Sequence, residues 1–170
     1  DESMLTVVTA NRDLPRKQEF ARELLALSPR ITCVAQNVNP RPGNAILGPE
    51  TRVLAGEPCM HDELLGCTFA ISPTSFYQTN PQQTEVLYQL AIEGMALRPN
   101  DILVDAYCGS GTIGLCAAHA AAQSGTPVHL LGIEQNESGV ADARLNARLN
   151  GLTPEQATFV AADATAYLRK

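Results

Sequence analysis

Apolar and polar positions follow two different periods in the first forty residues. Residues 5–10 are rich in Val and Thr and alternate imperfectly between apolar and polar, which predicts a strand. Pro15 suits the start of a helix, and apolar side chains then recur between residues 20 and 27 at the spacing of one helical face. Residues 31–38 resemble a second strand. Together these segments predict a small β-α-β unit.

The next stretch changes in composition before regular periodicity returns. Residues 39–58 are rich in Pro, Gly and Asn, so we expect an extended loop with a short strand at 52–54. Residues 60–71 predict a pair of strands with a hairpin or bulge at 64–66. A loop follows, and residues 82–96 carry apolar side chains on one side of a predicted helix.

From residue 101 onward, continuous apolar runs alternate with helical patterns. The run at 102–107 is typical of a strand that is buried on both faces of a parallel sheet. The later elements are expected as helices at 112–122, 138–150 and 164–169 and strands at 128–134 and 157–161. This alternation predicts an α/β fold with a doubly wound parallel sheet.

Composition narrows the class of protein. The chain has 170 residues, 45% of them apolar and 18% charged, which suffices for one full core or two small ones. We read no membrane helix and no secretory signal. Five cysteines with no Cys-x-x-Cys pair argue against a disulfide framework or a metal site, and favour a reducing, cytoplasmic location.

The net charge of −6 is unevenly distributed along the chain. Residues 1–60 carry seven basic and seven acidic side chains, whereas residues 61–170 carry five basic and eleven acidic ones. A protein that binds nucleic acid by electrostatics alone would show the opposite sign on at least one face. The second part of the chain is therefore not a convincing clamp for a phosphate backbone.

One glycine-rich motif points to chemistry. Residues 108–114 read Cys-Gly-Ser-Gly-Thr-Ile-Gly and satisfy Gly-x-Gly-x-x-Gly between a predicted strand and a predicted helix. The turn glycines Gly109 and Gly111 let a ligand approach the backbone, and the helix start offers unpaired N–H groups. Glu134 ends the next strand, where a carboxylate can accept hydrogen bonds from both hydroxyls of a ribose. We therefore predict a cofactor that contains a nucleoside.

Two further carboxylates help to identify the cofactor. Asp105 directly precedes the turn, where it would repel a pyrophosphate but would favour the ammonium and sulfonium groups of S-adenosylmethionine. Asp163 follows the third strand and can accept a hydrogen bond from an adenine amino group. The alternative reading of Asp163 is the N-cap of the last helix, and one residue can play both parts.

Several segments resemble the RNA (uracil-C5-)-methyltransferases, and most of all the bacterial branch that modifies 23S ribosomal RNA. The segments are Phe-Ala-Ile-Ser-Pro-Thr-Ser-Phe-Tyr-Gln-Thr-Asn-Pro at 69–81, residues 104–115, Gly-Ile-Glu at 132–134 and Ala-Arg-Leu-Asn-Ala-Arg-Leu-Asn-Gly at 143–151. Residues 5–60 resemble the region that precedes the methyltransferase domain in that family. The likeness thus covers nearly the whole chain.

The resemblance carries expectations for domains, cofactor and partner. It implies a central α+β region at 1–68, followed at 69–170 by the first half of a Rossmann-like class I methyltransferase domain. It implies S-adenosylmethionine as cofactor, contacted by Gln78, Tyr107 and Glu134. The expected partner is RNA, ribosomal rather than transfer RNA.

The resemblance also indicates what is missing. In that family a cysteine in a Ser-Cys-Asn-Pro-like motif attacks the uracil ring, and none of the five cysteines here precedes Asn-Pro. We therefore expect no catalytic residue in this chain, the nucleophile and the base lying beyond Lys170. Cys108 is expected to be a buried packing residue. The three parallel strands fall short of the seven that the family implies, so we interpret the chain as a fragment.

Two other functions remain open at this point. The glycine motif also fits an oxidoreductase that uses a nicotinamide dinucleotide, although Asp105 is unfavourable for its pyrophosphate. Alternatively, the β-α-β region could belong to a non-enzymatic module that binds RNA or protein. Its balanced charge and few aromatic residues argue against independent affinity for RNA.

Overall fold

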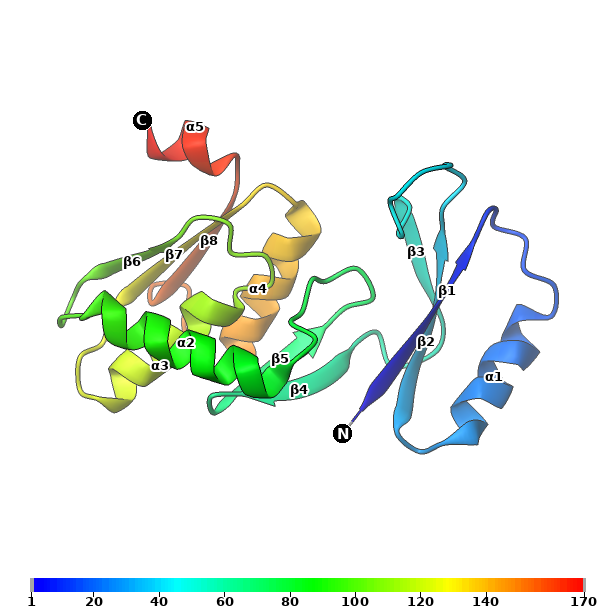
Figure 1. The fold of residues 1–170 in the computed structure, drawn as a ribbon, viewed down its shortest axis with the longest axis horizontal. Coiled ribbons are helices and arrows are strands. Elements are labelled where there is room, and N and C mark those ends of the chain that lie inside the picture. The colour runs from blue at the N-terminus through cyan, green and yellow to red at the C-terminus, as the bar shows by residue number, and fades with distance from the viewer. Residues whose placement is uncertain (1, 170) are drawn as a thin grey trace. The chain divides into compact units, whose positions relative to one another are not determined.

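The computed structural model describes residues 2–169, which form two compact units (Figure 1). The first unit comprises residues 2–62 with 71–74, and the second comprises residues 63–70 with 75–169. Each unit has a three-stranded sheet of its own. The domain boundary predicted after residue 68 stays a prediction.

The first unit contains the predicted β-α-β arrangement. Strand β1 (Ser3–Thr9) leads through α1 (Lys17–Leu27) to β2 (Ile31–Val38), and the two strands pair in parallel. A parallel pair needs such a crossover, because a short turn would reverse the chain. The core of this unit gathers Ala21, Val34 and Leu54 with partly buried apolar neighbours from α1 and the strands.

A third strand replaces much of the loop expected at 39–58. Strand β3 (Glu50–Gly56) pairs antiparallel with β2 over most of its length, whereas the sequence predicted only residues 52–54. The fully buried side chain of Asn37 binds the start of this segment: its Nδ2 donates to Gly48 O (3.0 Å) and Thr51 Oγ1 (2.7 Å). Residues 50–56 therefore form a strand because they pair with β2, although their composition predicted mostly loop.

The strand pair predicted at 60–71 is present. Strands β4 (Met60–Leu64) and β5 (Cys67–Ile71) form a two-stranded sheet joined by a turn of two residues. Both turn residues have positive φ, 50° at Leu65 and 77° at Gly66, which matches the twist of a tight hairpin.

The second unit holds a three-stranded parallel sheet in the order β6-β7-β8, with one helix after each strand. Its elements are α2 (Pro81–Met95), β6 (Ile102–Asp105), α3 (Thr112–Gln123), β7 (His129–Glu134), α4 (Glu137–Leu149), β8 (Ala157–Ala161) and α5 (Ala164–Leu168). The predicted α/β, Rossmann-like class is therefore confirmed.

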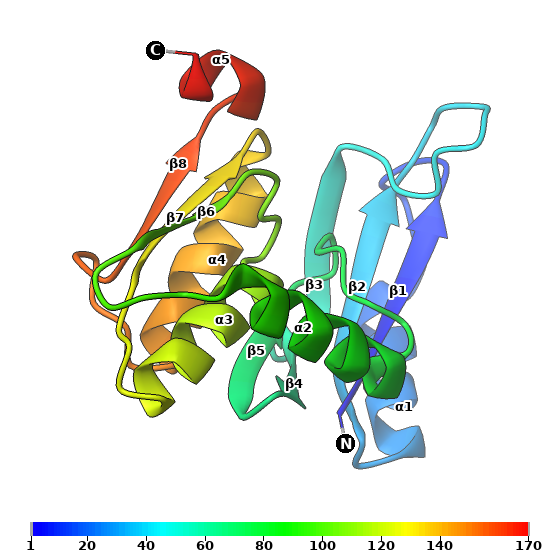
Figure 2. The same cartoon turned by 60° about the vertical axis from the view of Figure 1, so that its left-hand side comes forward.

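Helices α3 and α4 lie on the same face of this sheet (Figures 1 and 2). The chain moves in one direction from β6 to β8, and right-handed crossovers then bring both helices to one side. Leu103 and Leu130 are buried on the covered face, whereas Ile102 is 67% and Val104 41% exposed. The expectations of a doubly wound sheet and of a β6 buried on both faces are therefore wrong for the described residues.

Helix α2 has a clear start signal. Pro81 occupies the first turn of α2, and the side chain of Asn80 caps it by accepting from Gln83 N at 3.2 Å.

The hydroxyl groups of Tyr88 in α2 and Thr112 in α3 are hydrogen-bonded at 2.9 Å. Within residues 2–169, no helix has both the length and the apolar character needed to cross a bilayer.

Candidate functional site

A tight turn joins β6 to α3 at the carboxyl edge of the sheet. Gly109 and Gly111 both have positive φ, 52° and 84°, a region that costs most other residues energy. The turn is closed by a hydrogen bond from Gly111 N to Cys108 O (2.7 Å), and Cys108 N donates to Ile133 O of β7 (3.0 Å). Backbone pairing thus holds the turn against the end of the neighbouring strand.

The two glycines of the turn differ in their surroundings. A Cβ atom on Gly109 would meet nothing within 4 Å, so this side of the turn is open. A Cβ atom on Gly111 would lie 3.1 Å from Leu115 Cδ1 and 3.3 Å from Ala143 Cβ. Gly109 therefore leaves room for a ligand, whereas Gly111 lets α3 and α4 pack closely beneath the turn.

The structure brings Glu134 to this turn. Its Oε2 accepts a hydrogen bond from Gly109 N at 3.1 Å, and its Oε1 accepts from Asn136 N at 2.8 Å. Because both oxygens are bound to backbone N–H groups, the carboxylate has a defined orientation at the end of β7. The second lone pair of each oxygen remains an acceptor site for a ligand.

Asp105 places a second carboxyl group below the same turn. Its Oδ2 accepts from Gly114 N at 3.2 Å, at the start of α3. Burial raises the pKa of Asp105, the bond from Gly114 lowers it, and the charge of Glu134 raises it again. The two carboxyl groups therefore interact, and their combined charge favours a cationic ligand over an anionic one.

Cys108 is unsuited to act as a nucleophile at neutral pH. Burial, and then the charges of Asp105 and Glu134, raise its pKa to about 12, so the thiol stays protonated.

All five cysteines of the chain are free thiols. Among residues 2–169, no three or more His, Cys, Asp or Glu side chains are grouped so that they could hold a metal ion.

Tyr107 and Asp163 lie along the same edge of the sheet. Tyr107 follows β6 and is 76% exposed, so its ring is accessible beside the turn. Asp163 follows β8, and its Oδ1 accepts from Ala166 N at 2.7 Å as the N-cap of α5. The structure thus shows the capping role, while contact of Asp163 with an adenine stays a prediction.

Gln78 comes from a different part of the chain. It lies in the loop between β5 and α2 and is exposed. This loop is tied to α4 nearby, because Ser75 Oγ donates to Asp142 Oδ2 at 2.5 Å. A contact between Gln78 and a cofactor stays a prediction.

The sequence reasoning missed a buried side chain that contacts the turn. Asn146 of α4 is fully buried; its Nδ2 donates to Ser110 O at 3.0 Å and its Oδ1 accepts from Ala70 N at 2.8 Å. The available signal was an amide between Ala143 and Ala147, on the apolar face of a predicted helix. A polar residue at such a position is retained only where it finds partners.

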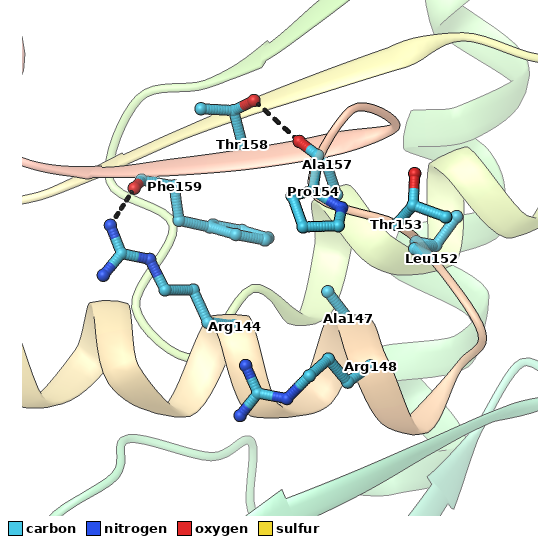
Figure 3. Close-up of a pocket in the computed structure, with 9 residues that line it drawn as sticks. All are labelled: Arg144, Ala147, Arg148, Leu152, Thr153, Pro154, Ala157, Thr158 and Phe159. Atoms are coloured by element: carbon cyan, nitrogen blue, oxygen red, sulfur yellow. Dashed lines mark hydrogen bonds between the residues drawn. The ribbon is translucent and has the colours of Figure 1, made fainter.

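A separate pocket of about 330 Å³ lies between α4 and β8 (Figure 3). Arg144 and Phe159 meet at its edge, where Arg144 Nη2 donates to Phe159 O at 2.7 Å. The residues that precede β8 line much of it, so it extends toward the amino end of that strand. Ligands of open α/β sheets bind at the carboxyl ends of strands, so we place the candidate site at the glycine turn instead.

Relatives named RNA methyltransferases match nearly the whole chain. No protein-family model matches the chain. It is 45% identical over 169 residues to an uncharacterized RNA methyltransferase of Lactiplantibacillus plantarum, covering 99% of this chain and 35% of that protein. It is 40% identical over 163 residues to one of Halalkalibacterium halodurans, covering 96% and 34%. The chain thus spans about a third of the length of these relatives.

Solved structures share the fold. A tRNA (uracil-54, C5)-methyltransferase of Pyrococcus abyssi, in complex with S-adenosyl-L-homocysteine, matches with a TM-score of 0.70 and 24% identity, covering 95% of this chain and 36% of that one. An S-adenosylmethionine-dependent methyltransferase of Agrobacterium tumefaciens matches with a TM-score of 0.55 and 19% identity, covering 85% and 43%. The described chain therefore has an α/β fold that matches the Rossmann-like methyltransferases.

Proposed function

We propose that this chain is the S-adenosylmethionine-binding part of an RNA methyltransferase that acts on C5 of uracil. The observation that carries the proposal is the Glu134 carboxylate bound to Gly109 N at the carboxyl edge of the sheet. A carboxylate at this position can accept hydrogen bonds from both hydroxyls of a ribose. The relatives that cover nearly the whole chain are named RNA methyltransferases, which supports RNA as the substrate.

The residues present fit S-adenosylmethionine. Gly109 leaves open space where a side chain would otherwise stand, and Tyr107 offers an accessible ring beside it. Asp105 and Glu134 supply the negative potential that suits an ammonium and a sulfonium group. When bound, this cofactor supplies an activated methyl group. The protein's part at this site is to bind the ribose, orient the cofactor and balance its charge.

The charge of Asp105 disfavours a nicotinamide dinucleotide. Its pyrophosphate would have to approach a turn that the carboxyl group of Asp105 directly precedes. Like charges at short range in a partly buried site repel strongly. Glu134 does not discriminate between the two cofactors, because a carboxylate at the end of this strand can also bind the ribose of a nicotinamide dinucleotide. The oxidoreductase alternative therefore has the glycine spacing in its favour and the electrostatics against it.

We further propose which RNA is the substrate. We propose 23S ribosomal RNA, on the resemblance of residues 69–81 and 104–115 to the branch that modifies it. A transfer RNA is the alternative, as in the enzyme of similar fold from Pyrococcus abyssi. We also propose that the catalytic nucleophile lies outside this chain, because none of its five cysteines precedes Asn-Pro and burial keeps the Cys108 thiol protonated. We further propose that the protein acts in the cytoplasm.

Calorimetric titration of the 170-residue chain tests the cofactor. We expect S-adenosylhomocysteine and S-adenosylmethionine to bind, and NAD to give no heat of binding. Thermal unfolding should shift upward with the bound ligand, because a ligand of the folded state stabilises it by mass action. Binding of NAD without binding of S-adenosylhomocysteine would overturn the cofactor assignment.

Methyl transfer tests the substrate. The full-length protein should transfer label from S-adenosylmethionine to C5 of uracil in 23S ribosomal RNA, and nucleoside analysis of the product identifies the base. Transfer RNA serves as the second substrate in the same assay. The 170-residue chain alone should transfer no label, and transfer by this chain would refute the claim that the nucleophile lies elsewhere.

A further inference from the structure

One stripe of polar side chains runs along α4. Asp142 and Asn146 of α4 and its C-cap residue Asn150 are spaced by four residues and therefore lie on one side of the helix. Asp142 accepts from Ser75 Oγ, and Asn150 pairs with both backbone groups of Thr68, accepting from its N (2.9 Å) and donating to its O (2.8 Å). The stripe thus holds the backbone of β5 and the loop that leads to Gln78.

Asn146 is the member of this stripe that also reaches the glycine turn. Its side chain is fully buried, and both ends of the amide are used: Ala70 N donates to Oδ1, and Nδ2 donates to Ser110 O. Burying an amide costs free energy unless its donors and acceptors are paired. A well-packed apolar residue would avoid that cost, so the two hydrogen bonds are the physical reason for an amide here.

The bond to Ser110 acts on the peptide between the two turn glycines. Ser110 is 7% exposed and stands between Gly109 and Gly111, so its carbonyl has little access to water. Holding this carbonyl fixes the plane of the Ser110–Gly111 peptide, whose N–H donates to Cys108 O. The turn is thereby held in the conformation in which Gly109 N meets Glu134.

We infer that Asn146 is a positioning residue, which pre-organises the glycine turn for the cofactor and links it to β5. The inference rests on the proposed function of the site, since the turn is the cofactor-binding element. Pre-organisation improves affinity because the ordering cost is met before the ligand binds. Asn146 itself touches the turn from below and acts on the cofactor through Ser110.

A matched pair of variants separates positioning from stability. Asn146→Asp keeps the acceptor for Ala70 N but replaces the donor to Ser110 O with an oxygen that repels it. Asn150→Asp makes the same chemical change one helical turn away and disturbs only Thr68 O and Asn146 O. Both variants lose hydrogen bonds between α4 and neighbouring backbone, but only the first one disturbs the turn.

Calorimetric titration with S-adenosylhomocysteine gives the first readout. We expect Asn146→Asp to raise the Kd about tenfold or more, which corresponds to about 1.4 kcal/mol, and Asn150→Asp to change it by less than about twofold. Urea unfolding of both variants measures the stability loss for comparison. An equal Kd in the two variants would overturn the inference, whereas a wild-type chain that binds no cofactor would overturn the proposed function.

Hydrogen exchange gives a readout that needs no ligand. In Asn146→Asp the amide of Gly111 should exchange about tenfold faster or more, while Asn150→Asp should leave its rate within about threefold. If Asn146→Asp does not fold, the wild-type chain still decides the question by NMR. The side-chain amide resonance of Asn146 should shift when S-adenosylhomocysteine is added and that of Asn150 should not; two unshifted resonances would contradict the inference.

Discussion

The Glu134 carboxylate accepts a hydrogen bond from Gly109 N at 3.1 Å, which joins the end of β7 to the turn after β6. The two residues are far apart in the chain but adjacent in space, because β6 and β7 are parallel neighbours. The other carboxylate oxygen is bound to Asn136 N, so rotation of the side chain would break two hydrogen bonds. The acidic group therefore faces the turn in a single orientation.

Glu134→Gln should weaken cofactor binding strongly. The amide has nearly the same size but no charge, and one of its two ends is a donor that faces a backbone N–H. Hydrogen bonds to charged groups contribute about 1.5–3 kcal/mol, so we expect the Kd for S-adenosylhomocysteine to rise about ten- to hundredfold in calorimetric titration.

Glu137→Gln is the control for the loss of charge alone. Glu137 is exposed in the first turn of α4 and lies close to Glu134 in the chain. Its change should alter the Kd by less than about twofold, because an exposed charge is screened by water and salt. Similar losses of affinity in the two variants would exclude a specific role for Glu134.

Asp105→Asn should stabilise the chain at neutral pH and lower its affinity for the cofactor. Burial raises the pKa of Asp105, so ionisation of this carboxyl group is less favourable in the folded state than in the unfolded state. The amide keeps an acceptor for Gly114 N without this cost. We expect a higher midpoint of urea unfolding at pH 7 and a lower affinity for S-adenosylmethionine.

The pH dependence checks the cause of that effect. In the wild-type chain, the contribution of Asp105 to the free energy of unfolding is complete below pH 3.8, which is the ordinary pKa of an aspartate in an unfolded chain. This contribution is lost as the pH rises through the raised pKa of the folded state. The stability gap between Asp105→Asn and wild type should therefore widen from pH 4 to pH 7. A gap of constant size across this range would show that ionisation of Asp105 is not responsible.

Gly111→Ala should destabilise the second unit more than Gly125→Ala does. Both glycines have positive φ, 84° and 72°, which costs an alanine about 1–2 kcal/mol. A Cβ on Gly125 meets nothing within 4 Å, whereas one on Gly111 would press on Leu115 and Ala143. We expect Gly111→Ala to lose about 1 kcal/mol more in urea unfolding. Equal losses would mean that close packing under the turn is unimportant.

Cys108→Ala should reduce the alkaline sensitivity of the chain. The pKa of Cys108 is raised to about 12 in the folded state, from an ordinary value of 9.0 for a cysteine thiol. Its contribution to stability is therefore complete below pH 9 and is lost as the pH rises toward 12. Between pH 9 and about pH 10.5, the free energy of unfolding should fall less steeply in Cys108→Ala than in wild type. An unchanged slope would refute the assignment of this titration to Cys108.

The sequence contained clear signals for the elements around the turn. Continuous apolar runs and the Gly-x-Gly-x-x-Gly spacing placed β6, β7 and the turn, because strand burial and turn conformation depend on residues close in the chain. The same logic placed Glu134 at the carboxyl edge of the sheet. These predictions needed only local patterns and the rule that parallel strands end at one edge.

Two errors came from interactions that local patterns do not contain. Strand β3 is longer than predicted, since its order comes from pairing with β2 and from the Asn37 side chain. Strand β6 is apolar up to its last residue, yet Ile102 is 67% exposed, because α3 packs against the other face of this strand. Which face is covered depends on the order of the strands, and hydrophobicity alone does not specify that order.

The amino-acid sequence by itself determined the parallel α/β pattern, the glycine turn and the acidic residues that follow the strands. Only the tertiary structure decided that Asn146 supports Ser110 from beneath and that Asp163 caps α5. The physical reason is that burial and hydrogen-bond partners depend on segments that meet only after the chain folds. A periodic pattern reports which side of an element is apolar, but partners across 36 residues, as for Asn146 and Ser110, require the packed structure.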